Sequence, residues 1–422
     1  RSDMNQSSQN PLFFKSPLVE ESCGAIWLKR ALILWAVLWI AVSVKFVLQP
    51  EKKSVYPCFA DSSINWWADR NLYDNQEYKT GFRYSPTFAL AFSIFAVLPA
   101  SLGGILWTAL NISLLVLALR LLVKEIFPGD WTRFQEAGFL ILSLAGCTRA
   151  IWSAQSNSLV FALAVFAVVS LKKERWWSAA FLLAAAVHIK LWPAALALLL
   201  MARFPWNLSP RFAAACAVLV IPPFLTRPLP VVLQQYQNWY GLLTGPYRTL
   251  RQGGLRDAYT IAEQFGTYVD DRVYTLLQLG MAGLALLWCI RLAKISNSMQ
   301  TYFTGVLTTW VCWQLLVGPG TERLTFLLAA PIASWALIVS FKEQCHRTLA
   351  VVAWLMLIPL GTGGVERLLL PVASWSPAIL PLGIIPLMVW QIVYVETHAR
   401  ESELQASEQT DSLLDQGTAR AA

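Results

Sequence analysis

The sequence has little charge and almost no histidine. Of its 422 residues, 14% are Asp, Glu, Lys or Arg and 56% are hydrophobic, whereas soluble domains are about 25% charged and roughly 45–50% apolar. This balance excludes a soluble globular domain and a disordered chain. The three histidines show no ligand spacing and the seven cysteines contain no CxxC pair. We therefore expect neither a structural metal site nor a disulfide-stapled secreted module.

Apolar residues occur in long runs separated by short charged clusters, which is the pattern of a helical protein with several membrane spans. A span needs about 20 apolar residues, or fewer where neighbouring helices bury it. The run at residues 86–98 lies between two prolines and is too short to cross comfortably, so we predict an interfacial helix there. The other runs predict about twelve spans, at residues 31–48, 102–123, 134–147, 159–171, 178–187, 191–201, 212–225, 273–290, 301–317, 324–341, 348–360 and 377–395.

The placement of Lys and Arg predicts the orientation. With residues 86–98 on the outer surface, every short basic cluster falls on one side, as expected of cytoplasmic loops. We interpret the net charge of +8 as this topology signal rather than as a sign of nucleic-acid binding. We expect a multi-pass protein of a plasma membrane, such as a bacterial inner membrane, with both termini cytoplasmic.

The sequence shows no internal repeats, and its apolar runs predict an all-α polytopic bundle. Two long outer loops interrupt it, and polar segments flank it at both ends. The predicted parts are a cytoplasmic tail (1–25), an N-terminal transmembrane module (26–225) that includes the first outer loop (49–101), a second outer loop (226–272), a C-terminal transmembrane module (273–397) and a disordered cytoplasmic tail (398–422).

The first outer loop is unusual for a channel or a simple transporter, because it is long and follows the first span directly. Residues 58–84 read CFADSSINWWADRNLYDNQEYKTGFRY, in which acids, bases and aromatics alternate. An interfacial belt accounts for the tryptophans, and a helix cap or a solvated loop accounts for an acid. Asp61, Asp69 and Asp74 are nevertheless candidates for chemistry.

The order of several motifs resembles that of the family 87 glycosyltransferases. In the first third, these are Asp61 at the opening of the loop, the pair Leu72-Tyr73, and the segment FRYSPTFAL at residues 82–90, which is similar to the Tyr-Pro-Pro-Leu turn of the family. The segment QSN at 155–157 resembles Gly-Gln-x-Asn, and KLWP at 190–193 resembles Lys-x-x-Pro. The resemblance covers roughly residues 26–340.

Two later motifs and four departures complete the comparison. The segment RQGGLR at 251–256 is similar to an Asn-Gln-Ser-Leu segment, and PGTER at 319–323 stands where the family has Pro-x-Ser with an acid and a histidine. Ser85 replaces the first proline, Ala154 the glycine, Gly253 a polar residue and Arg323 the histidine. The family's acceptor-binding residues are therefore the ones that can be assigned least well to positions of this sequence.

The family consists of class C membrane mannosyltransferases that use polyprenyl-phosphate sugars. The resemblance thus implies a class C bundle with interfacial helices in the first outer loop, a lipid-linked mannose donor and inversion at the sugar carbon. The acceptor stays open, as a glycan, lipid or protein. No DxD or ExD triplet occurs in the first outer loop, so we expect no divalent metal and no other cofactor.

The chemistry needs one base and several cations. A phosphate leaves without a proton, so the enzyme must deprotonate the acceptor hydroxyl and stabilise charge on the phosphate, whereas a glycosidase needs a carboxylate pair. With the resemblance, this identifies Asp61 as the predicted general base. The predicted phosphate ligands and other substrate-binding residues are Arg83, Tyr84, Gln155, Asn157, Lys190, Arg256, Glu322 and Arg323.

Structural roles compete with each of these assignments. Lys190 could extend from an apolar segment to the interface, Gln155 and Asn157 could cap helices, and Arg323 could pair with Glu322. A lipid or small-molecule transporter is the main alternative function, but paired repeats are not visible. A membrane acyl- or phosphotransferase would need a catalytic His or Ser arrangement or a metal.

Overall fold

A computed structural model describes residues 17–74, 81–244, 254–296, 298–361, 363–369, 371 and 375–399. These residues form helices and turns, and the strand-like pairing found among them is a single antiparallel bridge between Leu255 and Glu322. The all-α prediction is therefore confirmed for this part of the chain. Residues 400–422 of the predicted C-terminal tail lie outside the described residues.

Six helical segments are long and apolar enough to cross a membrane, which confirms a multi-pass protein by length and composition. They coincide with six of the predicted runs. These segments are Glu21–Leu48 in α1 (Pro17–Leu48), Ala100–Ile126 formed by α4 (Ala100–Leu121) and η1 (Leu122–Ile126), α9 (Pro205–Thr226), α13 (Asp271–Ile295), Arg323–Lys342 formed by η2 (Arg323–Leu328) and α15 (Ala329–Lys342), and Ser376–Ala399, which begins with η3 (Ser376–Ala378).

The other six predicted runs are also helices. Several are shorter than the roughly 20 residues that a span needs, and they pack against longer neighbours. The total of about twelve spans therefore stays a prediction. They are α5 (Arg133–Trp152), α6 (Asn157–Lys172), α7 (Trp176–Ile189), α8 (Pro193–Met201), α14 (Met299–Leu316) and α16 (Arg347–Leu357).

The first helix illustrates how the apolar runs pack. Ala31, Trp35, Val42 and Phe46 are spaced four, seven and four residues apart, which places them on one face of α1, and all are buried against α4 and α5. Trp35 donates its indole hydrogen to the carbonyl of Leu140 in α5 at 3.2 Å. The opposite face carries exposed Ile and Leu side chains, as expected of a helix that faces lipid.

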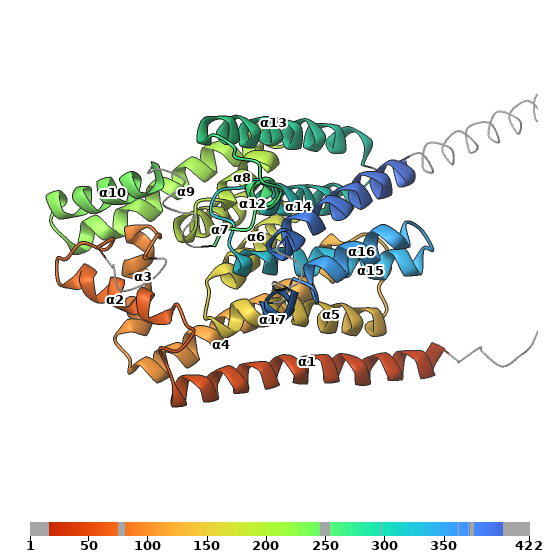
Figure 1. The fold of residues 1–422 in the computed structure, drawn as a ribbon, viewed down its shortest axis with the longest axis horizontal. Helices are drawn as coiled ribbons and strands as arrows, with labels where there is room; N and C mark the ends of the chain where they lie inside the picture. Colours follow the sequence, from red (N-terminus) through yellow and green to blue (C-terminus); the bar gives the residue numbers. More distant parts are fainter. Residues whose placement is uncertain are drawn as a thin grey trace, which may run out of the picture.

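The two predicted outer loops contain helices. The first loop forms α2 (Tyr56–Trp67) and α3 (Pro86–Ala96), and the second forms α10 (Leu229–Thr244) and α12 (Ala258–Gln264). Figure 1 shows α2, α3 and α10 together at the left end of the molecule. The 11 residues of α3 span about 16 Å, roughly half of a hydrocarbon core, which agrees with a helix that does not cross.

The basic clusters gather at the opposite end. Lys172 and Lys173 contact the carboxylate of Glu125 at 3.3 and 2.7 Å, and Lys342 donates to the carbonyl of Asp130 at 2.5 Å. In Figure 1 the start of α1 and the end of the last helix both lie at the right, away from α2 and α3. The short helix α17 (Gly363–Leu369) completes the described fold. Which end faces the cytoplasm stays a prediction.

Candidate functional site

A cavity of about 320 Å³ opens where the segments beside α2, α3 and α10 meet. Six helix-terminal or loop segments supply its walls, and they come from positions between residues 55 and 322. Five of the nine predicted site residues line it: Arg83, Tyr84, Gln155, Lys190 and Glu322. The structure therefore brings together residues that are far apart in the chain.

Tyr84 is the centre of the cavity wall. Its hydroxyl donates to Gln155 Oε1 at 3.1 Å and accepts from Ser156 Oγ at 3.3 Å. Its carbonyl accepts from the hydroxyl of Tyr73 at 3.0 Å. Because burial raises the pKa of Tyr84, the ring keeps its hydroxyl proton and holds the Gln155 amide in a fixed orientation.

Lys190 lies where α7 ends and before Pro193 begins α8. Its Nζ is 5.4 Å from the centroid of the Tyr84 ring, a cation–π contact. Among the described residues, the amine makes no hydrogen bond and no ion pair. Burial lowers the pKa of Lys190 to about 8; the charge of Glu322 opposes this shift and the charge of Arg83 adds to it. The cavity thus contains a cation whose hydrogen-bond donors are available.

The turn between α5 and α6 presents Gln155. Ala154 adopts a left-handed conformation with φ of +54°, and its carbonyl accepts from Trp107 Nε1 at 2.8 Å. This is the position where the family motif has glycine, which takes that conformation without strain. Ser158 donates to Asn111 at 2.8 Å, which ties the start of α6 to α4. The turn is therefore a fixed part of the site.

Asn157 is buried at the start of α6 but is not among the residues that line the cavity. Neither its amide nitrogen nor its amide oxygen has a hydrogen-bond partner among the described residues. A buried amide without partners costs roughly 1–3 kcal/mol, so this position favours a bound polar group or water. The capping alternative for Asn157 has no hydrogen bond to support it.

Asp61 lies on α2, half-buried and one turn after Cys58. Cys58 lines the cavity and Asp61 does not, so the carboxylate lies beside the cavity rather than in its wall. Burial and the charge of Asp61 together raise the pKa of the Cys58 thiol to about 12. Of the alternative bases, Asp69 forms an ion pair with Arg227 at 3.2 Å, and Asp74 is exposed.

The loop before η2 carries Glu322 and is joined to the second outer loop. Arg256 donates its backbone hydrogen to the carbonyl of Thr321 at 2.7 Å, next to the bridge between Leu255 and Glu322. Gln314 fixes the same loop, because the Thr321 hydroxyl donates to its carbonyl at 2.7 Å. Glu322 is thereby held at the cavity by two separate parts of the chain.

Arg256 and Arg323 lie beside the cavity but are not among its lining residues. The guanidinium of Arg256 donates to the carbonyls of Gly254 and Leu255 at 3.2 and 2.9 Å. Burial lowers the pKa of Arg256, and the nearby charge of Asp257 opposes that shift. Their predicted role as phosphate ligands stays a prediction. Gln252 and Gly253 of the same motif lie outside the described residues.

Sequence reasoning missed the apolar half of the cavity. Cys58, Phe59, Trp192, Leu242 and Leu243 line it, and the last two belong to α10, which lies within the predicted second outer loop. The apolar positions of α10 recur at helical spacing in LPVVLQQYQNWYGLLT, a signal that could have identified an amphipathic helix.

Within the described ranges, no group of three or more His, Cys, Asp and Glu side chains could hold a metal ion. The cavity instead offers two cations, one carboxylate, one amide and one phenol beside an apolar wall. Such a set can bind an anion next to a hydroxylated group, with an apolar chain alongside.

Comparison with known proteins agrees with this chemistry. The family model of glycosyltransferase family 87 matches residues 82–319, which is more than half of the chain. The matched segment contains all the cavity-lining residues named above except Cys58, Phe59 and Glu322. A search of curated proteins found no significant match.

Proposed function

Because the chain belongs to glycosyltransferase family 87, we propose that it moves a sugar, mannose, from a polyprenyl-phosphate donor to an acceptor hydroxyl with inversion. The observation that supports this most is Lys190, an amine in the cavity that no described residue neutralises by a hydrogen bond or an ion pair. Lipid-phosphate donors need such a cation, because negative charge builds on the phosphate as it leaves.

In the proposed binding mode, Lys190 and Arg83 contact the donor phosphate. A phosphate that accepts hydrogen bonds from two cations is strongly held, because charge-assisted hydrogen bonds are about twice as strong as neutral ones. Glu322 accepts hydrogen bonds from sugar hydroxyls, and Gln155, oriented by Tyr84, bonds another part of the sugar. Arg256, Arg323 and Asn157 are proposed to contact the substrates once these fill the site.

Asp61 is the proposed general base. Its carboxylate takes the proton of the acceptor hydroxyl as the acceptor oxygen attacks the anomeric carbon. The bond between that carbon and the phosphate oxygen breaks, and the electron pair leaves with the polyprenyl phosphate. Since attack and departure occur on opposite faces, the configuration inverts. The position of Asp61 beside the cavity, one turn from Cys58, leaves the cavity itself to the donor.

The apolar wall is proposed to guide the prenyl chain. Leu191, Trp192, Leu242 and Leu243 line the cavity at the ends of α7 and α10, and such side chains can pack against a polyprenyl chain that enters from the bilayer. The site would then lie at the extracytoplasmic surface of a plasma membrane, with both termini cytoplasmic. We propose that no metal is required, since two side-chain cations can neutralise the phosphate.

A transfer assay tests this function. The full-length protein, purified into lipid, is incubated with radiolabelled polyprenyl-phosphate mannose and a panel of glycan, lipid and protein acceptors. We expect label in at least one acceptor, with an α-linkage, and none from a nucleotide sugar. Transfer from no prenyl-phosphate sugar to any acceptor would reject the proposal and favour a lipid transporter.

A further inference from the structure

A second, larger cavity of about 770 Å³ lies between the start of α1, the end of α4 and the start of α5. Arg133 opens α5 and lines this cavity, whereas α5 ends near Gln155 in the candidate active site. A helix of 20 residues is about 30 Å long, which equals the hydrocarbon thickness of a bilayer. The two cavities therefore lie at opposite ends of α5, about one hydrocarbon thickness apart.

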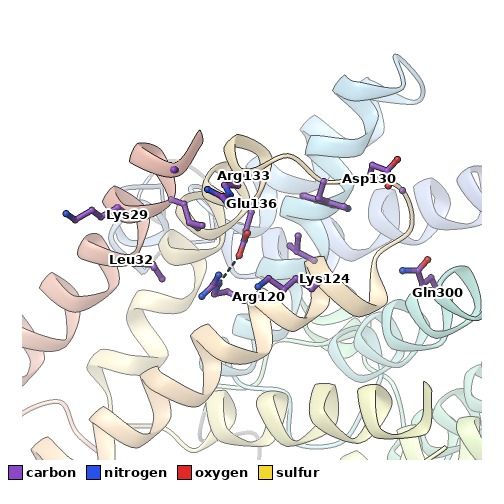
Figure 2. Close-up of a pocket in the computed structure, with 13 residues that line it drawn as sticks. Lys29, Leu32, Arg120, Lys124, Asp130, Arg133, Glu136 and Gln300 are labelled. Atoms are coloured by element: carbon purple, nitrogen blue, oxygen red, sulfur yellow. Dashed lines mark hydrogen bonds and ion pairs between the residues drawn. The ribbon is translucent and has the colours of Figure 1, made fainter. Parts of the chain in front are cut away.

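Positive charge dominates the lining of this cavity. Its lining contains four cations, Lys29, Arg120, Lys124 and Arg133, and two carboxylates, Asp130 and Glu136. Figure 2 shows Arg120 and Lys124 side by side on successive turns, with Arg133 and Glu136 near them on α5, while the ammonium of Lys29 points away from the others.

The cations differ in how far they are neutralised. Arg120 Nε contacts the buried carboxylate of Glu136 at 2.8 Å, and this pair is part of the fold. Arg133 contacts Glu21 at 3.7 Å, but both side chains are more than half exposed, and such pairs contribute little. Lys124 is exposed and has no ion pair or hydrogen bond within the described part of the chain. The charges of Lys124 and Arg133 are thus available to an anion.

Apolar side chains adjoin these charges. Leu28, Leu32 and Val123 line the same cavity, and Trp27 packs edge-on against Phe134 at 6.3 Å, with both rings partly exposed. Exposed aromatic rings at the end of a membrane helix are typical of the headgroup level. The cavity therefore joins an anion-binding rim to a surface that suits acyl chains.

We propose that this cavity binds the headgroup of an anionic phospholipid, with the phosphate between Lys124 and Arg133 and an acyl chain against Leu28 and Leu32. Basic pockets between transmembrane helices bind such headgroups in general. A free phosphate would use the same cations but would gain nothing from the apolar wall. The site is separate from the proposed glycosyl transfer and does not depend on it.

The test compares lipid affinities of the full chain by native mass spectrometry in detergent, titrated with phosphatidylglycerol or phosphatidylcholine. We expect phosphatidylglycerol to bind at least tenfold more tightly. The double variant Lys124→Gln/Arg133→Gln should lose roughly thirtyfold in that affinity, since each surface charge near a headgroup contributes about a factor of five.

The matched control is Arg175→Gln/Lys294→Gln. It removes the same two residue types from exposed positions that do not line the cavity, and its affinity should stay within twofold of wild type. Equal losses in both double variants, equal binding of the two lipids, or displacement of phosphatidylglycerol by millimolar inorganic phosphate would overturn the proposal. If the double variant fails to fold, the single exposed substitution Lys124→Gln should still weaken binding about fivefold.

Discussion

The amine of Lys190 lies over the ring of Tyr84, 5.4 Å from its centroid. A ring face attracts a cation by about 0.5–2 kcal/mol without using any of its three hydrogen-bond donors. A carboxylate would accept hydrogen bonds from the amine. The contact with the ring instead holds the charge in place and leaves the N–H donors available to a bound anion. The pair therefore suits a site that must accept an anion and release it after each turnover.

Replacing Lys190 should weaken donor binding. A hydrogen bond to a charged group contributes about 1.5–3 kcal/mol, so Lys190→Gln should raise the dissociation constant of a prenyl-phosphate sugar about ten- to hundredfold. Lys190→Arg should retain most of the affinity, because a guanidinium also binds phosphate. Lys294→Gln, at an exposed position on α13, is the control. Unchanged donor binding in Lys190→Gln would remove this residue from the site.

Donor affinity should depend on pH. Burial lowers the pKa of Lys190 to about 8, and lysine is charged below its pKa, so binding should be full below pH 8 and decline as pH rises through that value. Bound phosphate stabilises the charged amine, so kcat should hold to higher pH than kcat/KM. The profile of Lys190→Arg should be flat between pH 7 and 10. A wild-type profile equally flat would contradict this account.

Asp61→Asn should slow transfer and leave donor binding intact. Loss of a general base typically lowers the rate by about 10²- to 10⁴-fold, and Asp61 lies outside the cavity wall that holds the proposed phosphate ligands. Single-turnover measurements with saturating donor separate the two effects. Asp74→Asn, an exposed carboxylate of the same loop, serves as the control. A slow Asp74→Asn variant beside a normal Asp61→Asn variant would transfer the role to Asp74.

Ala154→Gly should stabilise the protein. Ala154 has φ of +54°, a conformation in which a Cβ atom costs the folded state roughly 1–2 kcal/mol. Glycine removes this cost, but it also stabilises the unfolded chain by about 0.4–1 kcal/mol, because that chain gains conformational freedom. A net gain of about 0.5–1 kcal/mol should appear as a higher melting temperature in detergent. Ala184→Gly, inside α7, should instead lower it, because glycine destabilises a helix interior. A lower melting temperature for Ala154→Gly would refute the strain at this turn.

The helices were predictable because a helix that crosses a bilayer needs a run of about 20 apolar residues, which is visible in the sequence. Every predicted span coincides with a helix, and α3 follows from its flanking prolines and its short length. The helix α10 was not predicted, because Gln234 and Gln235 break the continuous apolar run that identifies a span, although its apolar residues recur at helical spacing. Gln235 is buried, where it bonds the backbone of Arg70 and Leu72, a tertiary role that no local pattern reveals.

The candidate site was predictable in part, because its polar residues belong to motifs that occur in a fixed order along the chain. Motif order identified Arg83, Gln155, Lys190 and Glu322, and all four line one cavity. It could not distinguish them from Arg256, whose guanidinium donates to the carbonyls of Gly254 and Leu255, because the order of motifs does not determine which way a side chain points. The apolar wall could not be predicted, because Leu and Trp are common throughout a membrane protein and no pattern distinguishes those that line the cavity.

The most direct test of the account is to find where the donor binds. A photoreactive prenyl-phosphate sugar is cross-linked to the full-length protein in lipid, and the modified peptides are identified by mass spectrometry. We expect labels at residues 190–192 and 242–243, which excess unlabelled donor should suppress. Suppressible labelling confined to the opposite cavity, around Leu28 and Leu32, would contradict the proposed location of the active site.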